Sequence, residues 1–401
     1  MIVQQSPRTP TAESGDPFAT LDALRPLVEA HITRERVLHY LTALADAPAP
    51  STAASTIRAP LLRGLLSSDG ALGTSRLTLD ANFANTGSTV MLTGESGPEK
   101  RLWYFAHLDT ISYLLRSREG QRYPLVPFCY HLIGDGIRDA VAFRYDMDAN
   151  RYLICAHGSL VSEAGTPYFL PVDGAEELRP GDRVSPRSAL RVAADGMVTG
   201  HLDNAGGAAA LAVAAPVLAE AGIDAMLAFP DEEEGPPGSG SQVMGRGGSR
   251  IVAHLPSPDL AIVADMQQAG GQQSSTGEDG PSNTTRLGRG AVLSEFSSLA
   301  RGAVTPPDLY VLARHWSDRL AMLGLTVQES NNAYTSRSDD VSVLLKTPNI
   351  LLLGFPGFNR HFDRSEPSAN LSDIVGLSKA LVYVSVLRSA LVDLRRRQDF
   401  G

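Results

Sequence analysis

Two copies of the tripeptide His-Leu-Asp, at residues 107–109 and 201–203, are the feature of this sequence that most suggests chemistry. In an extended segment, side chains two residues apart point to the same side. Each copy would therefore present an imidazole and a carboxylate to one point, as a metal site or an acid–base centre requires. The question that follows is whether the two copies do the same job.

Other groups able to bind metal or move protons follow further hydrophobic segments. Glu232 and Glu233 come after an apolar run, Asp265 comes after the next such run, and His361 lies in a loop after a third. Each has an ordinary explanation by itself, because a Glu-Glu pair is usually a solvated turn and an Asp after a strand often caps a helix. Together, at the carboxyl ends of several strands, they are typical of a ligand site in an open α/β sheet.

Alternating strands and helices are predicted over most of the chain. Strand patterns occur at residues 77–79, 89–92, 102–107, 225–229, 260–264 and 350–353. Helix patterns occur at residues 17–45, with a break expected near Pro26, and at residues 205–221, 306–323 and 371–394. This alternation predicts an α/β fold with a central, mostly parallel or mixed sheet flanked by helices.

Residues 112–199 have a different sequence pattern and are expected to form a small inserted β-domain. Short β-prone runs, such as residues 141–145 and 151–155, are separated by turns rich in Gly, Pro, Asp and Asn. With 401 residues, the chain is also too long for one simple core. We expect a disordered N-terminus over residues 1–17, a catalytic α/β domain from residues 18–111 and 200–401, and the insert between its two parts.

The order of these motifs resembles that of a known group of enzymes. His-x-Asp, Asp-Asn, Glu-Glu-x-Gly, an Asp after a strand and a late His follow one another as in the co-catalytic metallopeptidases of the M20, M28 and M42 families. Stretches at residues 178–204, 286–290 and 338–366 favour M42, the glutamyl/leucyl aminopeptidases of the TET type. The resemblance implies a zinc-peptidase-like fold with an inserted small β-barrel or PDZ-like domain.

Three positions depart from the usual M42 pattern. Ala205 stands where an Arg usually follows, and Arg360-His361-Phe362 replaces an aromatic-His-Ser order. A Gly- and Ser-rich turn near residue 50 is replaced by Ala-Pro-Ala-Pro at residues 47–50. These changes bear on substrate choice and assembly more than on metal binding.

The resemblance implies two divalent metal ions per chain and assigns their ligands. Asp203 bridges the two ions, His107 and Asp265 complete one site, and Glu233 and His361 complete the other. Two ions need a carboxylate that can contact both. Nitrogen and oxygen ligands without cysteine favour zinc, with cobalt or manganese as alternatives.

Two further carboxylates are given catalytic roles by the same resemblance. Asp109 should accept the second N–H of His107 and fix its tautomer. Glu232 is left as the general base that activates water. Three consecutive glutamates occupy residues 232–234, and the pair Glu232 and Glu233 is chosen because Gly235 must stand fourth in Glu-Glu-x-Gly.

The remaining histidine and the cysteines are expected to be structural. His201 has no matching ligand in the family, so the twin tripeptides are expected to act differently. Cys129 and Cys155 are the two cysteines of the chain, and they are expected to be buried apolar fillers rather than a redox pair.

The composition of the chain limits the classes of partner that it can be expected to bind. A net charge of -9, with no basic cluster denser than residues 395–397, argues against nucleic acid. Residues 1–17 lack the apolar segment of a signal peptide, and no uninterrupted apolar stretch is long enough to span a bilayer. We therefore expect a cytoplasmic location, with neither nucleic acid nor membrane as a partner.

The leading functional hypothesis is a binuclear metal-dependent hydrolase that releases N-terminal residues from peptides. A variant is the same chemistry on a non-peptide amide, such as deacylation of an N-acyl amino acid or a specialised metabolite. A third hypothesis is a non-catalytic homologue that keeps the fold as a binding module. The resemblance also implies a homo-oligomer.

Overall fold

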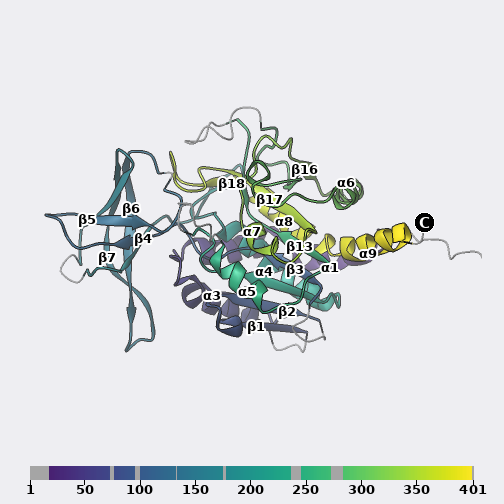
Figure 1. Cartoon of the computed structure of the whole chain (residues 1–401), viewed down its shortest axis with the longest axis horizontal. Coiled ribbons are helices and arrows are strands. Elements are labelled where there is room, and N and C mark those ends of the chain that lie inside the picture. Colours follow the sequence, from purple (N-terminus) through teal and green to yellow (C-terminus); the bar gives the residue numbers. More distant parts are fainter. Residues whose placement is uncertain are drawn as a thin grey trace, which may run out of the picture.

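A mixed α/β body carries a closed β-barrel on one side (Figure 1). The computed structural model describes residues 18–72, 76–94, 100–131, 133–174, 178–235, 245–271 and 283–399. The body is built around a twelve-stranded sheet, and the barrel is formed by strands of the middle part of the chain. The predicted α/β class and the inserted β-structure are both confirmed.

The centre of the sheet is parallel. Strands β12 (Ala225–Phe229), β3 (Leu102–Phe105), β13 (Leu260–Val263) and β17 (Ile350–Phe358) lie side by side in this order and run the same way. Antiparallel pairs on both sides make the whole sheet mixed. The outer strands are β1 (Leu77–Asp80), β2 (Thr89–Thr93), β10 (Arg191–Val192), β11 (Met197–Thr199), β14 (Met266–Gln268), β15 (Ala291–Ser294), β16 (Val327–Glu329) and β18 (Ser368–Asn370).

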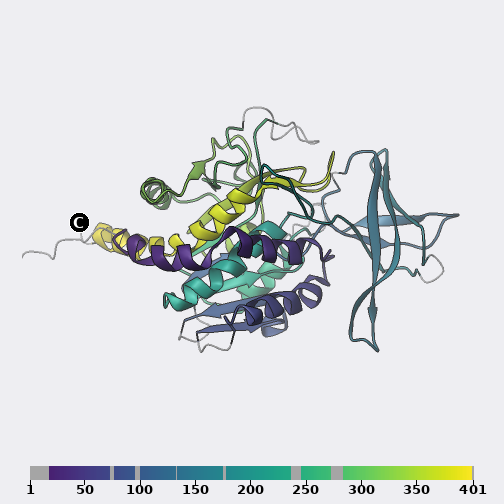
Figure 2. The same ribbon diagram turned by 180° about the vertical axis from the view of Figure 1, so that it is seen from behind.

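Helices cover both faces of the sheet, which explains the nearly continuous apolar runs of the central strands. In β3, Leu102 and Tyr104 pack into the cluster on one face, whereas Trp103 and Phe105 pack into the cluster on the other. The first face carries α1 (Thr20–His31), α2 (Arg34–Ala45), α3 (Ala54–Ser68), α4 (Ala205–Glu220) and α8 (Leu371–Tyr383), several of which are seen together from behind in Figure 2. The second face carries α5 (Arg246–Ala253) and α7 (Asp340–Val343).

Helix α4 is buried on almost every side because it lies between the sheet and helices α2 and α8. Its alanine-rich sequence suits this position, since small side chains allow close approach on all sides. Helix α6 (Pro307–Met322) packs beside β16 and beside α9 (Val386–Asp399), which runs out at the far end of the body. Short 3-10 turns occur at Phe83–Asn85 and Ser298–Ala300.

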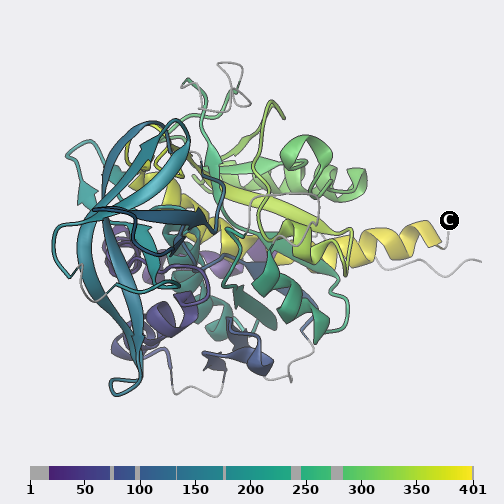
Figure 3. The same ribbon diagram turned by 60° about the vertical axis from the view of Figure 1, so that its left-hand side comes forward.

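The inserted structure is a six-stranded barrel, which closes in the order β4-β5-β8-β7-β6-β9. It stands at the opposite end of the body from α9 (Figure 3). The division of the chain at residues 111 and 200 stays a prediction. The strands are β4 (Tyr113–Leu115), β5 (Tyr123–Pro127), β6 (Gly136–Asp146), β7 (Arg151–Glu163), β8 (Thr166–Pro171) and β9 (Arg183–Pro186).

Two helices begin or break elsewhere than the sequence pattern predicts. Pro26 lies within α1, and the break comes instead at Ile32 and Thr33, whose side chain accepts a hydrogen bond from the Arg36 amide and caps α2. The closing helix is two helices, α8 and α9, bent by 45° at the break. Within the described residues, no single helix is long and apolar enough to cross a membrane, and only this bent pair passes that test by joint length and composition.

Candidate metal centre

The candidate ligands meet where the parallel strands end. The loops after β3, β13 and β17 carry His107, Asp265 and His361, and the loop between β11 and α4 carries Asp203. Asn204 fixes this last loop, because its side chain accepts from the Gly207 amide at the start of α4 and donates to Ala264 O at 2.8 Å. Because Asn204 follows Asp203 directly, its contact with Ala264 holds Asp203 close to the end of β13.

The ligand atoms form two groups that share Asp203. In site A, His107 Nε2 lies 3.3 Å from Asp203 Oδ1 and 3.7 Å from Asp265 Oδ2. In site B, His361 Nε2 lies 3.5 Å from Asp203 Oδ2 and 3.3 Å from Glu234 Oε2. The ligand atoms of each group all lie within 4.8 Å of one another. Each oxygen of Asp203 therefore faces a different site, as a bridging carboxylate would.

These residues fit divalent metal ions. His107, Asp203, Asp265 and His361 are all at least nine-tenths buried, and so is Glu234. His107 Nε2, Asp203 Oδ1 and Glu234 Oε1 are nevertheless without a hydrogen-bond partner. Buried polar atoms almost always have a partner, and buried carboxylates need an opposite charge. A cation at each site would supply both.

The structure differs from the sequence prediction in which two glutamates face the centre. Glu232 adopts a left-handed backbone conformation, with φ of 62°, and its carboxylate belongs to neither metal group. It pairs with Arg250 Nη2 at 2.5 Å and lies 3.7 Å from Arg246 Nη1. Glu233 and Glu234 are consequently the inward pair, one residue later than expected.

Asp109 contacts both this inward pair of glutamates and His107. Its Oδ1 accepts from the Glu233 amide at 3.0 Å, and its Oδ2 accepts from the Glu234 amide at 3.2 Å. The same Oδ2 accepts from Ser51 Oγ at 2.7 Å, and Oδ1 lies 3.4 Å from His107 Nδ1. The Asp109 backbone O lies closer still, 3.1 Å from His107 Nδ1. Asp109 therefore positions the first histidine mainly through its backbone carbonyl and the glutamate loop through its buried carboxylate.

Glu233 lies beside site A but belongs to neither group of ligands. Its Oε2 is 3.6 Å from His107 Nε2. Burial, together with the nearby charge of Asp265, raises the pKa of the Glu233 carboxyl well above its usual range. A carboxyl in this environment accepts a proton more readily than an exposed one.

Two supporting residues were not expected from the sequence. Buried Asp231 accepts from the amides of Thr52 and Ala54, which fixes the start of α3 against the end of β12. Arg58 is fully buried and donates to Leu108 O at 2.6 Å, between the two functional residues of the first tripeptide. The run of acids from residue 231 to 234 was the available signal for Asp231, whereas nothing local marks Arg58.

The second tripeptide contributes its aspartate alone. His201 belongs to neither metal group, and its Nε2 donates to Pro186 O at 2.7 Å. Burial lowers the pKa of His201 to about 4, so the ring is neutral near pH 7. Cys129 is buried and Cys155 is half-buried.

This asymmetry can be measured by exchanging each histidine. The His107→Ala chain should lose the ion of site A, because it lacks the histidine of that group, whereas His201→Ala should keep both ions. Metal content of the two purified variants, by elemental analysis, tests this. Equal metal loss from both would restore a symmetric interpretation of the tripeptides.

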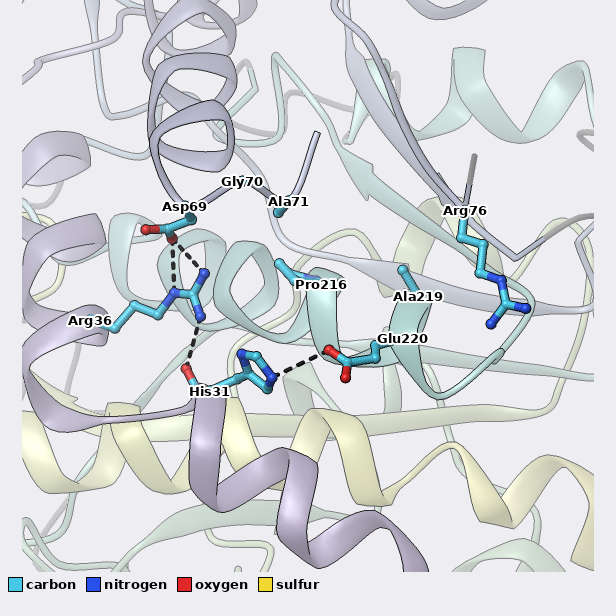
Figure 4. Close-up of a pocket in the computed structure, with 9 residues that line it drawn as sticks. All are labelled: His31, Arg36, Asp69, Gly70, Ala71, Arg76, Pro216, Ala219 and Glu220. Carbon is cyan, nitrogen blue, oxygen red and sulfur yellow. Dashed lines mark hydrogen bonds and ion pairs between the residues drawn. The ribbon is translucent and has the colours of Figure 1, made fainter. Parts of the chain in front are cut away.

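A separate pocket of about 380 Å³ lies at the ends of α1, α3 and α4 (Figure 4). Its charged lining is already engaged, since Arg36 Nη2 pairs with Asp69 at 2.7 Å and His31 Nε2 lies 3.3 Å from Glu220. Among the described residues, those that line this pocket differ from those of the two metal groups.

The fold of this chain is similar to that of the TET aminopeptidases. The TET1 peptidase of Pyrococcus horikoshii aligns with a TM-score of 0.64 and 18% identity, over 87% of this chain and 99% of that one. An aminopeptidase of the archaeon Desulfurococcus kamchatkensis gives 0.64 and 16%, over 88% and 97%.

A TET aminopeptidase from a marine-sediment Thaumarchaeota archaeon gives a TM-score of 0.65 and 15% identity, over 87% of this chain and 96% of that one. No protein-family model matches the sequence, and no curated protein matches it. The fold expected from the M42 resemblance is thus confirmed by structures that share little sequence with the chain.

Proposed function

We propose that this protein is a binuclear metal-dependent aminopeptidase of the M42 type. The observation that carries the proposal is the shared carboxylate of Asp203, which faces His107 and Asp265 with one oxygen and Glu234 and His361 with the other. The fold of the TET aminopeptidases supports it. Zinc is the proposed ion, with cobalt or manganese as alternatives.

The ions would be held by the two groups that share Asp203. When bound, two such ions supply Lewis-acid polarisation of an amide carbonyl and acidify water. Glu234, rather than Glu233, is the proposed glutamate ligand of site B, because its Oε2 faces His361. Asp109 keeps His107 Nε2 directed at site A by holding the other ring nitrogen.

Glu233 is the proposed general base. Its buried carboxyl has a raised pKa and lies next to the ligands without being one of them. It would take a proton from the attacking water at one carboxylate oxygen and return it to the leaving amine. The pairing of Glu232 with Arg250 and Arg246 favours Glu233 over Glu232 for this role.

A substrate panel with and without metal tests the proposed function. The purified chain should bind about two divalent ions and cleave aminoacyl-amides and short peptides with a free N-terminus, and a chelator should abolish both. Cleavage of N-acyl amino acids without any aminoacyl hydrolysis would favour the deacylase instead. A folded chain that binds no metal would exclude both enzymes and leave the binding module.

Homo-oligomeric assembly is the second part of the proposal. The TET1 peptidase of Pyrococcus horikoshii can assemble into a tetrahedron or a large octahedral shell. We infer that this chain also forms a homo-oligomer with itself, which mass measurement in solution would test. The cytoplasmic location stays a prediction from the sequence.

A further inference from the structure

The residue after His361 belongs to the core of the barrel rather than to the α/β body. Phe362 is 2% exposed and packs in one hydrophobic cluster with barrel residues such as Tyr113, Leu115 and Phe169. Its backbone is left-handed, with φ of 59°, a conformation that a bulky residue keeps only when its surroundings hold it there. The loop that carries His361 therefore also carries a side chain that is buried in the core of the barrel.

The ring of His201 packs against the Phe362 ring. The two ring centroids are 4.8 Å apart, and the neutral His201 ring donates to Pro186 O, at the end of barrel strand β9. His201 also lies two residues before the shared ligand Asp203. His201 therefore contacts both the end of a barrel strand and the Phe362 ring, and it lies beside a metal ligand in sequence.

Backbone contacts continue this attachment on both sides of Phe362. The Gly134 amide, from the segment before β6, donates to Asp363 O at 2.8 Å. His361 Nδ1 lies 3.3 Å from Tyr130 O, in the segment after β5. A proton on Nδ1, donated to this carbonyl, leaves Nε2 free to face Asp203 and Glu234.

The two sites differ in which part of the fold contacts Nδ1 of the histidine. At site A, the contacts of His107 Nδ1 among the described residues are with Asp109, two positions along the same segment. At site B, the corresponding nitrogen contacts a carbonyl of the insert, and the next side chain is part of the insert's core. Loss of packing in the barrel at Phe362 should therefore move one histidine and leave the other in place.

We propose that Phe362 is a positioning residue through which the inserted barrel holds His361 in site B. The inference rests on the proposed function, because it assigns one of the two proposed ion sites to the insert. It gives the barrel a role in the metal centre of the same chain, and it gives the departure at residue 362 a physical reason.

The test is metal binding by the full chain, without any substrate. Zn²⁺ is titrated into metal-free wild type, Phe362→Ala and the matched control Phe169→Ala, which removes the same side chain from the same core without a link to a ligand. We expect Phe362→Ala to bind one ion as the wild type does and the other about 10–100-fold more weakly. Phe169→Ala should bind both ions normally, and adding His107→Ala to Phe362→Ala should remove the remaining ion.

Other outcomes would overturn the inference. Normal binding of both ions by Phe362→Ala would show that the contact does not position His361, and equal weakening in both variants would show a general effect of barrel stability. If Phe362→Ala does not fold, Phe362→Leu compared with Phe169→Leu gives the same contrast with a smaller change. A wild type that binds fewer than two ions would instead overturn the proposed function, and the inference with it.

Discussion

The Glu233→Gln chain should bind its metal ions normally and lose nearly all turnover. Glutamine keeps the shape and hydrogen-bonding capacity of the side chain but cannot accept a proton near pH 7. Because general acid–base groups contribute roughly 10²–10⁴-fold to rate, kcat should fall by about that factor while KM changes little. Metal content and steady-state kinetics on an aminoacyl-amide measure the two effects separately.

Glu232→Gln is the matched control, since it makes the same chemical change one residue away. Its carboxylate pairs with Arg250 and Arg246 outside the centre, so the variant should keep both its metals and most of its activity. An inactive Glu232→Gln beside an active Glu233→Gln would return the general base to the position that the sequence motif selects. Loss of metal from Glu233→Gln would instead make Glu233 a ligand.

The sequence was sufficient to predict that most of the candidate ligands lie close together. His107, Asp265 and His361 follow apolar strands, and the carboxyl ends of parallel strands meet at one edge of a sheet. The order of the strands was not needed for that conclusion, since every central parallel strand ends at the same edge. The motif resemblance then singled out Asp203 among the remaining acids.

The register of the glutamates could not be obtained in this way. Spacing from Gly235 selects Glu232, but the placement of the Glu232 carboxylate depends on two distant arginines and on a left-handed backbone that no local pattern assigns to glutamate. The amides of Glu233 and Glu234 are held by Asp109, more than 120 positions earlier in the chain. Such contacts are tertiary, and they override a one-residue choice made from a motif.

The barrel also has features that a sequence pattern does not predict. Its short β-prone runs and turn residues predict strands, but closure depends on pairings between distant segments, such as β4 with β9. The burial of Phe362 in that barrel is still less accessible to a sequence pattern, because the residue lies far outside the insert. The unusual residue after the last histidine was the only signal, and it did not indicate which part of the fold would bury it.

Replacing the shared carboxylate should have the largest effect on metal binding. Asp203→Ala removes one ligand atom from each site, so both sites should lose high affinity and metal content should fall from about two ions per chain to near zero. Asp265→Ala removes a ligand from site A alone and should leave the ion of site B. Elemental analysis of the two variants after identical purification distinguishes a shared ligand from two independent ones.

Thermal stability provides a second measurement of the same effect. Without metal, the centre buries Asp109, Asp203, Glu233, Glu234 and Asp265 together, and ions that bind only the folded state stabilise it. The wild type should therefore gain about 4 kcal/mol for each occupied site when free metal is about 1,000 times the Kd of that site, and chelation should remove that gain. Asp203→Ala should melt at the same temperature with and without metal, since neither site remains. A full metal-dependent shift in that variant would show that Asp203 does not bridge the two ions.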